Sequence, residues 1–498
     1  MLLTSSWLID GLMYLSILLI TTYSYLTRNF NYWKRKNVRY LKPVPLFGNL
    51  YDVLSFKTTT QECIKKIWDE IDAPYFGMFI FDEPVLVLKS PKLIKDVLIK
   101  DSSIFCNRRV ATPSHPNMAH GMFFLKYNEW RKVRKMLSPI FTVGMIKYLQ
   151  PHIIDINKTM INFVQKNCGI FDATKIGEDF AIEFLVRCFY EANPRCFNEK
   201  TSVFKKYIHS MFAFNFRNGV VQNLFFLKPS WASALKLNFV AKNCIKFFED
   251  VFKRIMTTRE SYDGKPRNVV DVANKAAREK KNGEQDTLEF ETIMSNVLLF
   301  LIAGRDSTTS IISFTLYEIA INQEIQNKLR KEVKLNFQKY GSICFEGVQD
   351  NKYLEMCINE TLRKYPTLPF LDRTPINDYQ FKDTDLKVDK NTSILIPLFA
   401  LHRDEQIYPN CKLYSPERFL NEKINSDGLD FIPFGEGPRI CIGKRIGLLA
   451  VSMALSNLVL NFSFEKCNET PNEIEFETKS FALTSKHGLF VKISPIQE

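Results

Sequence analysis

A long apolar run lies near the beginning of the chain. Residues 7–25, WLIDGLMYLSILLITTYSY, form 19 consecutive positions with a single charged residue, Asp10. As an α-helix this run would be about 28 Å long, which is close to the thickness of the hydrocarbon core of a bilayer. The pattern therefore predicts one membrane-spanning helix.

Basic residues follow this run, and none precedes it. The positive-inside preference then puts the N-terminus in the lumen of the endoplasmic reticulum and the rest of the chain in the cytosol. The alternative is a cleaved secretory signal, but the basic first region and the small-residue cleavage site of such a signal are not evident. We expect residues 1–27 to be an uncleaved signal anchor, and the protein to be single-pass in the endoplasmic reticulum membrane.

Residues 28–49 are basic and contain the stretch KPVPLFGN at 42–49. Each proline fixes its own φ and favours an extended residue before it. We expect 28–49 to be a stiff linker or hinge that holds a soluble domain, residues 50–498, at a set angle to its anchor.

Within that domain, helical periodicity dominates from about residue 60 to residue 365. Strand-like alternation occurs at 84–90, 391–397 and 487–495, so a small sheet is expected to unite distant segments. The polar stretch 265–286 indicates an exposed loop or a frayed helix. The predicted fold class is mostly α with a small β region.

Residues 288–322 form the longest helix candidate. The middle of this segment is apolar on nearly all sides, which is typical of a helix inside a core. The stretch AGRDST at 303–308 interrupts it with a glycine, which costs about 1 kcal/mol relative to alanine, and with a carboxylate that needs a partner. Asp306, Ser307 and Thr308 are therefore candidate functional residues. The alternative is a packing contact beside a charge that faces solvent.

The composition narrows the class of partner. The 498 residues include 42 phenylalanines, which favours an aromatic-lined interior, and the formal net charge is +13. No zinc-finger spacing, RNA-binding aromatic motif or basic recognition helix accompanies that charge. Nucleic acid is therefore excluded as the expected partner, and a membrane surface together with an acidic protein is favoured.

The eleven cysteines are scattered, odd in number and without a C-x-x-C pair. A disulfide framework and a structural zinc site are therefore disfavoured. Most of these cysteines are expected to be small buried hydrophobic residues.

One cysteine, Cys441, stands in the unusual stretch FGEGPRICIGKR at 434–445. Glycines allow a backbone to approach a large flat ligand, and the start of a helix near Ile442 favours a thiolate. Arg439 suits a carboxylate, and Phe434 suits a π-system. This stretch therefore has the character of a loop that offers sulfur to the metal of a planar, anionic cofactor.

The pattern F-x-x-G-x-R-x-C-x-G within this stretch resembles the cytochrome P450 family of haem-thiolate monooxygenases. Two further motifs resemble that family in the same order along the chain, ETLR at 360–363 and PERF at 416–419. The resemblance implies the cytochrome P450 fold and a buried charge cluster of Glu360, Arg363 and Arg418 that supports the cysteine loop.

The cofactor that the resemblance implies is haem b, with Cys441 as the axial ligand of its iron. The stretch WRKVR resembles the propionate-binding W-x-x-x-R of the family. Ala303 and Gly304 would leave room for dioxygen beside the haem. The residues expected to bind the haem carboxylates are Trp130, Arg134, Arg373, Arg439 and, more weakly matched, Arg108, and Phe434 would lie against the ring.

The implied reaction is RH + O2 + 2 electrons + 2 protons giving ROH and water, with Asp306 and a neighbouring hydroxyl relaying protons. The family usually has threonine where this chain has Ser307, which lacks the methyl group that restricts the rotamer. Thr308 could share its role. Arg305 is a second departure, and the sequence leaves open whether it pairs with a nearby acid or faces away from the pocket.

Electrons are expected from NADPH through a membrane-bound NADPH–cytochrome reductase, with cytochrome b5 as a candidate second donor. A basic docking face for an acidic flavoprotein is one interpretation of five residues, and ordinary solvated side chains are the other. These residues are Arg131, Lys132, Lys135, Lys444 and Arg445.

Details such as ETLRKYPTLPFLDRTP are most similar to the insect microsomal enzymes of family 6, which act on plant toxins, insecticides and some endogenous lipids. An apolar small-molecule substrate is expected near residues 106–122, 206–250, 295–304, 367–372 and 480–486. Two other functions remain open, a haem-thiolate isomerase or dehydratase that uses no O2, and a non-catalytic membrane-bound haem sensor. The retained pair Asp306 and Ser307 argues against the isomerase, and a sensor should tolerate loss of that pair.

Overall fold

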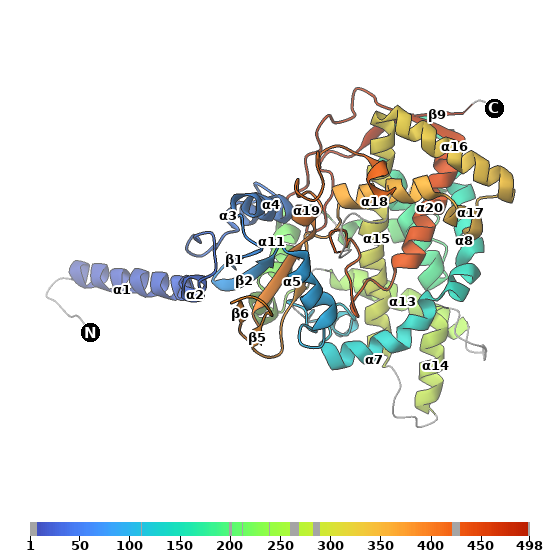
Figure 1. Ribbon diagram of the computed structural model, residues 1–498. Coiled ribbons are helices and arrows are strands. Elements are labelled where there is room, and N and C mark those ends of the chain that lie inside the picture. Colours follow the sequence, from blue (N-terminus) through green and yellow to red (C-terminus); the bar gives the residue numbers. More distant parts are fainter. Residues whose placement is uncertain are drawn as a thin grey trace.

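The computed structural model describes residues 7–496 except 111, 199–201, 212, 239, 259–267, 282–288 and 421–428. One helix projects from a body that is mostly helical and that carries small sheets on the side nearest this helix and at the C-terminal end (Figure 1). The predicted fold class, mostly α with a small β region after an apolar N-terminal helix, is confirmed.

The projecting helix is α1 (Trp7–Thr27), whose 21 residues have the length and composition of a membrane span. Only 6% of its apolar window is buried. A second helix of similar character, α15 (Phe290–Ile321), has 67% of its window buried and is therefore a core helix. The two predicted apolar helices thus form as expected, one outside the body and one within it.

The segment 28–49 packs on the first strand of the body, β1 (Tyr75–Ile80). Within it, α2 (Tyr32–Arg35) carries Trp33, whose side chain is fully buried and whose Nε1 donates to the carbonyl of Met78 at 3.1 Å. A Cβ on Gly77 would lie 2.4 Å from the Trp33 ring, so only glycine allows this contact. The segment expected to be a hinge is therefore docked on the sheet.

The strands form three small sheets. The first has the order β1-β2-β7-β4, in which β2 and β7 are parallel and the other neighbours are antiparallel. The second has the order β3-β9-β8, and the third joins β5 to β6. The bounds of these strands are β2 (Glu83–Leu88), β3 (Gly169–Asp172), β4 (Phe370–Arg373), β5 (Tyr379–Gln380), β6 (Lys387–Val388), β7 (Ser393–Pro397), β8 (Phe462–Glu465) and β9 (Phe490–Pro495).

All three predicted strand runs form strands. The runs at 84–90 and 391–397 contribute the parallel pair β2 and β7, so distant segments do meet in one sheet. The run at 487–495 joins the second sheet, where β9 pairs with β3 and β8.

The remaining helices make up most of the body. They are α3 (Tyr51–Leu54), α4 (Thr60–Glu70), α5 (Pro91–Lys95), α6 (Pro116–Ala119), α7 (Tyr127–Leu137), α8 (Val143–Lys166), α9 (Ala173–Leu185), α10 (Val203–Met211), α11 (Phe216–Leu227), α12 (Pro229–Ala234), α13 (Lys242–Thr258), α14 (Val269–Lys281), α16 (Gln323–Tyr340), α17 (Phe345–Gln349), α18 (Lys352–Lys364), α19 (Leu398–Leu401) and α20 (Lys444–Asn461).

Helix α14 corrects one expectation. The polar stretch 265–286 is helical over Val269–Lys281, and Val269 and Val270 at its start are fully buried. Of the two alternatives for this stretch, the helix is confirmed over these residues, and the exposed loop is wrong there because two apolar residues anchor the helix. The remainder of the stretch, 265–267 and 282–286, lies outside the described residues.

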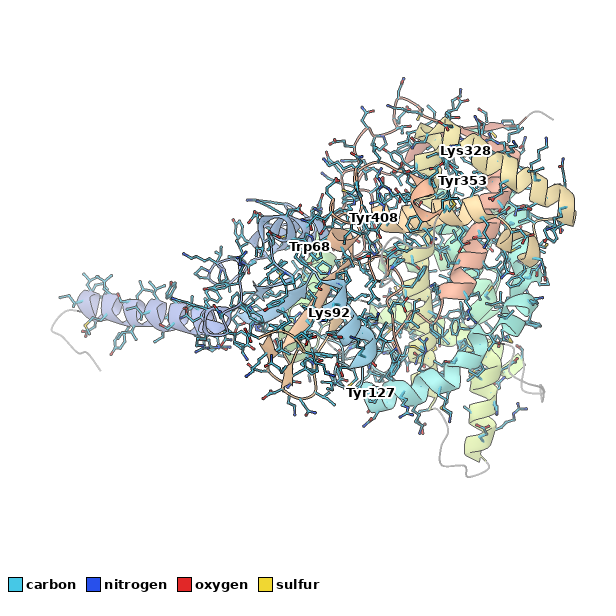
Figure 2. All side chains as sticks on the ribbon, in the orientation of Figure 1. Trp68, Lys92, Tyr127, Lys328, Tyr353 and Tyr408 are labelled. Carbon is cyan, nitrogen blue, oxygen red and sulfur yellow. The ribbon has the colours of Figure 1, made fainter. Side chains whose placement is uncertain are left out.

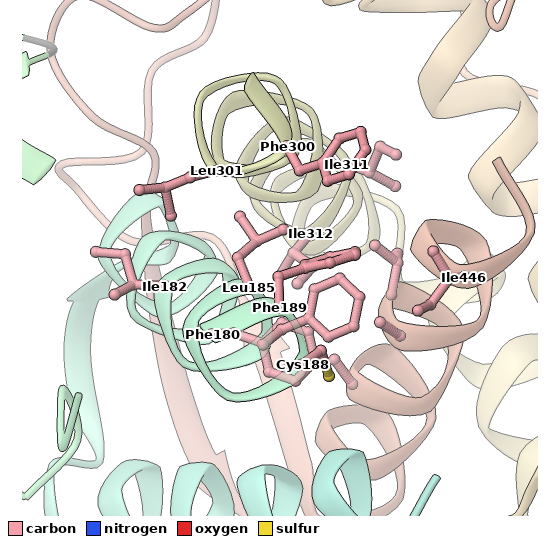
Figure 3. Packing of buried hydrophobic residues seen from close by; sticks show 14 of the residues in the cluster. Phe180, Ile182, Leu185, Cys188, Phe189, Phe300, Leu301, Ile311, Ile312 and Ile446 are labelled. Carbon is pink, nitrogen blue, oxygen red and sulfur yellow. The ribbon is translucent and has the colours of Figure 1, made fainter. Parts of the chain in front are cut away.

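Two hydrophobic clusters hold the body together. The larger is built by helices, and α15 crosses it beside α9 and α20, with Leu185, Phe300 and Ile446 among the residues in Figure 3. The smaller lies under the first sheet and includes Trp68, labelled in Figure 2. Helix α15 is buried at 293–301 and again at 308–320, but not continuously between them. That interruption coincides with the AGRDST stretch.

Candidate functional site

The loop before α20 presents Cys441. Gly435 and Gly437 have φ values of +72° and +73°, in the left-handed region that favours glycine. A Cβ on Gly437 would lie 1.9 Å from the carbonyl oxygen of Leu98, so this position admits no side chain. The backbone N–H of Cys441 donates to the carbonyl of Phe434 at 3.0 Å, which closes the loop on itself.

Replacing Gly437 with alanine should therefore disrupt the loop. We expect a loss of about 3 kcal/mol or more, since the new Cβ combines a backbone clash with a strained φ. The matched control is Gly447→Ala in α20, where a Cβ meets nothing within 4 Å and helix propensity favours alanine. Thermal unfolding of both purified variants is the measurement, and equal midpoints would contradict the role given to Gly437.

Cys441 is solvent-accessible in the structure. The surrounding protein atoms nevertheless desolvate its thiol and raise the pKa of that group. The N–H of Gly443 and the charge of Arg134 act in the opposite direction, which is the effect expected of the loop, but burial outweighs them. A bound metal cation would reverse this balance, because a coordinated thiol loses its proton.

Two of the predicted arginines lie near this thiol, and two more lie near one of these arginines. Arg108 and Arg134 interact electrostatically with Cys441, and Arg108 in turn repels Arg373 and Arg439. Burial and this repulsion lower the pKa of Arg373 to about 9 and that of Arg439 to about 10. Asp372 partly neutralises this positive charge, since its Oδ1 lies 3.6 Å from Nη1 of Arg108.

The arginine cluster of Arg108, Arg134, Arg373 and Arg439 has more positive charge than its protein partners balance. Arg439 is buried, and its Nε and Nη1 have no hydrogen-bond partner among the described residues, while its Nη2 donates to the carbonyl of Leu125 at 3.0 Å. Its guanidinium lies 4.5 Å from the centre of the Trp130 ring, on α7. Buried cations require anions, and guanidinium groups suit carboxylates. The residues present therefore fit a cofactor with carboxylates and a metal near Cys441, as haem has.

The AGRDST stretch gives α15 an accessible surface at its centre. Ala303 is exposed although buried residues precede and follow it, and Ser307, one turn later, is half-buried and donates to the carbonyl of Ala303 at 2.9 Å. Thr308 is buried. Of the two candidate hydroxyls, only that of Ser307 shares the accessible face of Ala303.

Gly304 faces a different neighbour. A Cβ at this position would lie 2.5 Å from the Leu185 side chain of α9, and Leu185 is part of the packed core. The missing side chain of Gly304 thus permits close packing of α15 on α9, and the space at this level of the helix lies beside Ala303.

Arg305 pairs with nearby acids, which is one of the two alternatives that the sequence leaves open. Arg305 is buried and forms ion pairs with two acids, Asp306 at 2.5 Å and Glu178 of α9. Burial raises the pKa of Asp306, and Arg305 opposes that rise. The carboxylate is therefore partnered by its own neighbour in the sequence, and Arg305 does not face away from the acids.

The predicted charge cluster behind the cysteine loop is confirmed. Arg363 donates to both carboxylate oxygens of Glu360, at 2.7 and 2.9 Å, and both side chains are fully buried. Arg418 lies 3.5 Å from the same carboxylate.

Sequence reasoning missed His402, which connects this cluster to the segment directly before the cysteine loop. Arg363 donates to the carbonyl of His402 at 2.9 Å, and the N–H of Ile432 donates to the His402 ring at 3.2 Å. Burial lowers the pKa of His402 to about 3, so the ring is neutral and can accept this bond. No local pattern marks this histidine, because its partners lie far apart in the chain.

Comparison with known proteins agrees with this geometry. The model of the family described as Cytochrome P450 matches residues 38–491. The chain therefore belongs to the cytochrome P450 family, whose members are haem-thiolate monooxygenases.

Its curated relatives include insect proteins of family 6. The chain is 32% identical to Cytochrome P450 6k1 of Blattella germanica, over 98% of each chain. It is 31% identical to Cytochrome P450 6j1 of the same cockroach, over 95% of each chain. It is 28% identical to Probable cytochrome P450 6g2 of Drosophila melanogaster, over 94% of this chain and 95% of that protein. The resemblance to insect family 6 enzymes is thereby confirmed.

Proposed function

We propose that this chain is a microsomal monooxygenase that inserts one oxygen atom of O2 into an apolar small molecule, with electrons from NADPH delivered by a membrane-bound reductase. The observation that carries the proposal is the arginine cluster beside Cys441, with buried guanidinium nitrogens of Arg439 left for an anionic ligand. Membership of the cytochrome P450 family supports the reaction class.

In this proposal Cys441 would hold the haem iron through its sulfur, and the arginine cluster with Trp130 would hold the haem carboxylates. Phe434 and Ala303 would contact the cofactor. The bound haem supplies the activation of O2. The chain itself contributes Asp306, which is paired with Arg305, and Ser307, on the accessible face of α15, to hold and move protons. Thr308 has a packing role.

An apolar substrate is supported by aromatic contacts between three of the expected substrate segments. Phe226 stacks on Phe481 with 4.0 Å between ring centres, and the edge of Phe370 meets Phe481 at 5.7 Å. Phe123 meets Phe226 at 6.5 Å. Aromatic linings favour apolar ligands, so xenobiotics, plant toxins, insecticides and endogenous lipids are the proposed substrate classes.

The reductase, with cytochrome b5 as a second donor, would dock on a basic surface near the cysteine loop. Arg131 and Lys135 are exposed one turn apart on α7, and Arg445 is exposed at the start of α20. The apolar helix α1 supports anchoring in the endoplasmic reticulum membrane, with the body on the cytosolic side as the basic residues after α1 favour.

Reconstitution of the full chain with the reductase in phospholipid vesicles tests this function. With NADPH and ¹⁸O2, apolar candidate substrates should gain one labelled oxygen atom, and omission of the reductase should abolish the product. Product formed without NADPH and reductase would indicate an isomerase or dehydratase. Haem binding without any turnover across the substrate classes would favour the sensor.

A further inference from the structure

A small cavity, lined by polar and apolar side chains, lies between α9, α15 and the turn at 484–485. The volume open to the centre of a water molecule is about 20 Å³, and one water needs roughly 10–15 Å³ of such volume. Glu178, Asp306, Thr309 and Thr174 are among the residues that line it. The cavity thus has room for one water, and its walls carry the polar groups that a water requires.

Two hydroxyl groups in this wall lack a partner among the described residues. Thr309 is 7% exposed, and its Oγ1 makes no hydrogen bond there; the buried Oγ1 of Thr174 also makes none. An unsatisfied buried hydroxyl is costly, and buried water commonly satisfies such groups. These hydroxyls are independent evidence that the cavity is a hydration site.

Arg305 holds the two carboxylates of the cavity in place. One guanidinium nitrogen pairs with Asp306 and the other with Glu178, so the two acids are fixed on the same cation. The guanidinium keeps its own protons, because its pKa is raised still further by these acids. Any proton that passes between the acids must therefore move through another group, and both acids also line the cavity.

Glu178 also connects the cavity to the surface. Its Oε2 lies 3.5 Å from Nε2 of His209 on α10, and the His209 side chain is 45% exposed. Beside it, Lys205 pairs with Asp179 at 2.6 Å, away from the set of residues that line the cavity. Glu178 is thus a carboxylate of the cavity wall that also contacts a histidine exposed to solvent.

We propose that this cavity binds one ordered water, and that this water passes protons from Glu178 to Asp306. Glu178 and Arg305 are then positioning and relay residues for the monooxygenase reaction, and the relay part rests on the proposed function. In each transfer an O–H bond of Glu178 breaks, the water gains that proton and gives another to the carboxylate of Asp306. Glu178 recovers its proton from bulk solvent beside His209.

The charges around the two acids favour this direction. Burial raises the pKa of Glu178, but His209, Arg305 and Lys205 together outweigh burial and leave that pKa lowered. The pKa of Asp306 is raised by burial, with Glu178 adding to the rise and Arg305 opposing it. Asp179, the other acid next to Glu178, is held by Lys205. Relative to the ordinary pKa of each group, the surroundings thus favour loss of a proton from Glu178 and retention of one on Asp306.

A crystal structure of the haem-loaded chain tests the water directly. We expect one ordered water within hydrogen-bond distance of Thr309 Oγ1 and of a carboxylate oxygen of Glu178 or Asp306. In Thr309→Val, which has nearly the same shape without the hydroxyl, the water should be lost or poorly ordered. A dry cavity in the unmodified chain would overturn the proposal, and this readout does not depend on turnover.

The relay is tested with Glu178→Gln and the adjacent control Asp179→Asn. Glu178→Gln should lower the rate of product formation about tenfold or more and divert NADPH electrons to hydrogen peroxide, with an increased solvent deuterium isotope effect. Asp179→Asn should retain the product-to-peroxide ratio. The reduced, carbon-monoxide-bound spectrum should be unchanged in both, which excludes damage to the cofactor site.

Equal coupling in Glu178→Gln and the unmodified chain would overturn the relay. Arg305→Lys provides a second test, since lysine keeps the charge but lacks the planar fork that holds two carboxylates. It should show part of the loss seen in Glu178→Gln, and full coupling would contradict the role of Arg305. If the unmodified chain forms no oxygenated product at all, the proposed function fails, whereas the ordered water is still decided by the crystal structure.

Discussion

Replacement of Cys441 by alanine is expected to abolish the spectrum of the haem-thiolate centre. The reduced, carbon-monoxide-bound form of the unmodified chain should have the red-shifted Soret band that names the family. Thiolate ligation produces this band, and alanine offers the iron no ligand. Monooxygenase activity should disappear with it.

The matched control is Cys106→Ala. Cys106 is a buried thiol that interacts electrostatically with Arg439 of the same arginine cluster, but it does not belong to the loop. This variant should keep the red-shifted band. A persistent band in folded, haem-loaded Cys441→Ala, or its absence in the unmodified chain, would remove Cys441 as the thiolate ligand and the proposed mechanism with it.

The second large effect is expected from Glu360→Gln in α18. This substitution leaves Arg363 fully buried without its charge partner and takes the nearby acid from Arg418. Loss of one partner of a buried ion pair costs about 3–5 kcal/mol. That is a large part of the stability of a typical domain, about 5–15 kcal/mol, so little folded and haem-loaded protein should be recovered.

Glu355→Gln on the same helix is the control. Glu355 pairs with Lys352 at the surface, where its side chain is 61% exposed, and such pairs contribute about 0–1 kcal/mol. Thermal unfolding and the yield of the haem-loaded protein are the measurements. If both glutamine variants unfold at the same temperature as the unmodified chain, the Glu360 cluster does not support the loop.

Local motifs explain why much of the site could be predicted. The glycines and the cysteine of the loop lie within ten positions of one another, so the geometry of the turn depends on residues that are close in the sequence. Glu360 and Arg363 are one helical turn apart, and their pairing follows from helix periodicity. Helix α15 was predictable because its apolar positions are continuous enough to require a core.

Contacts across the fold could not be predicted in the same way. The partner of Arg305 on α9 lies 127 residues earlier, and no pattern near Arg305 selects Glu178. The role of Gly304 could not be predicted either, because the side chain that packs against it, Leu185, lies on another helix. His402 and the docking of Trp33 on β1 also depend on partners that only the folded chain brings together.

The connection between α1 and the body, which begins at Arg28, is short and is held by polar contacts. Arg28, directly after the helix, pairs with Asp82 at 2.7 Å, and the Asn29 side chain donates to the carbonyl of Asp82 at 3.1 Å. Together with buried Trp33, these contacts leave no loose tether between the span and the β1–β2 turn. If α1 spans a bilayer as proposed, a tilt of this helix would be transmitted to the body, so that lipid thickness would set how deeply the protein sits.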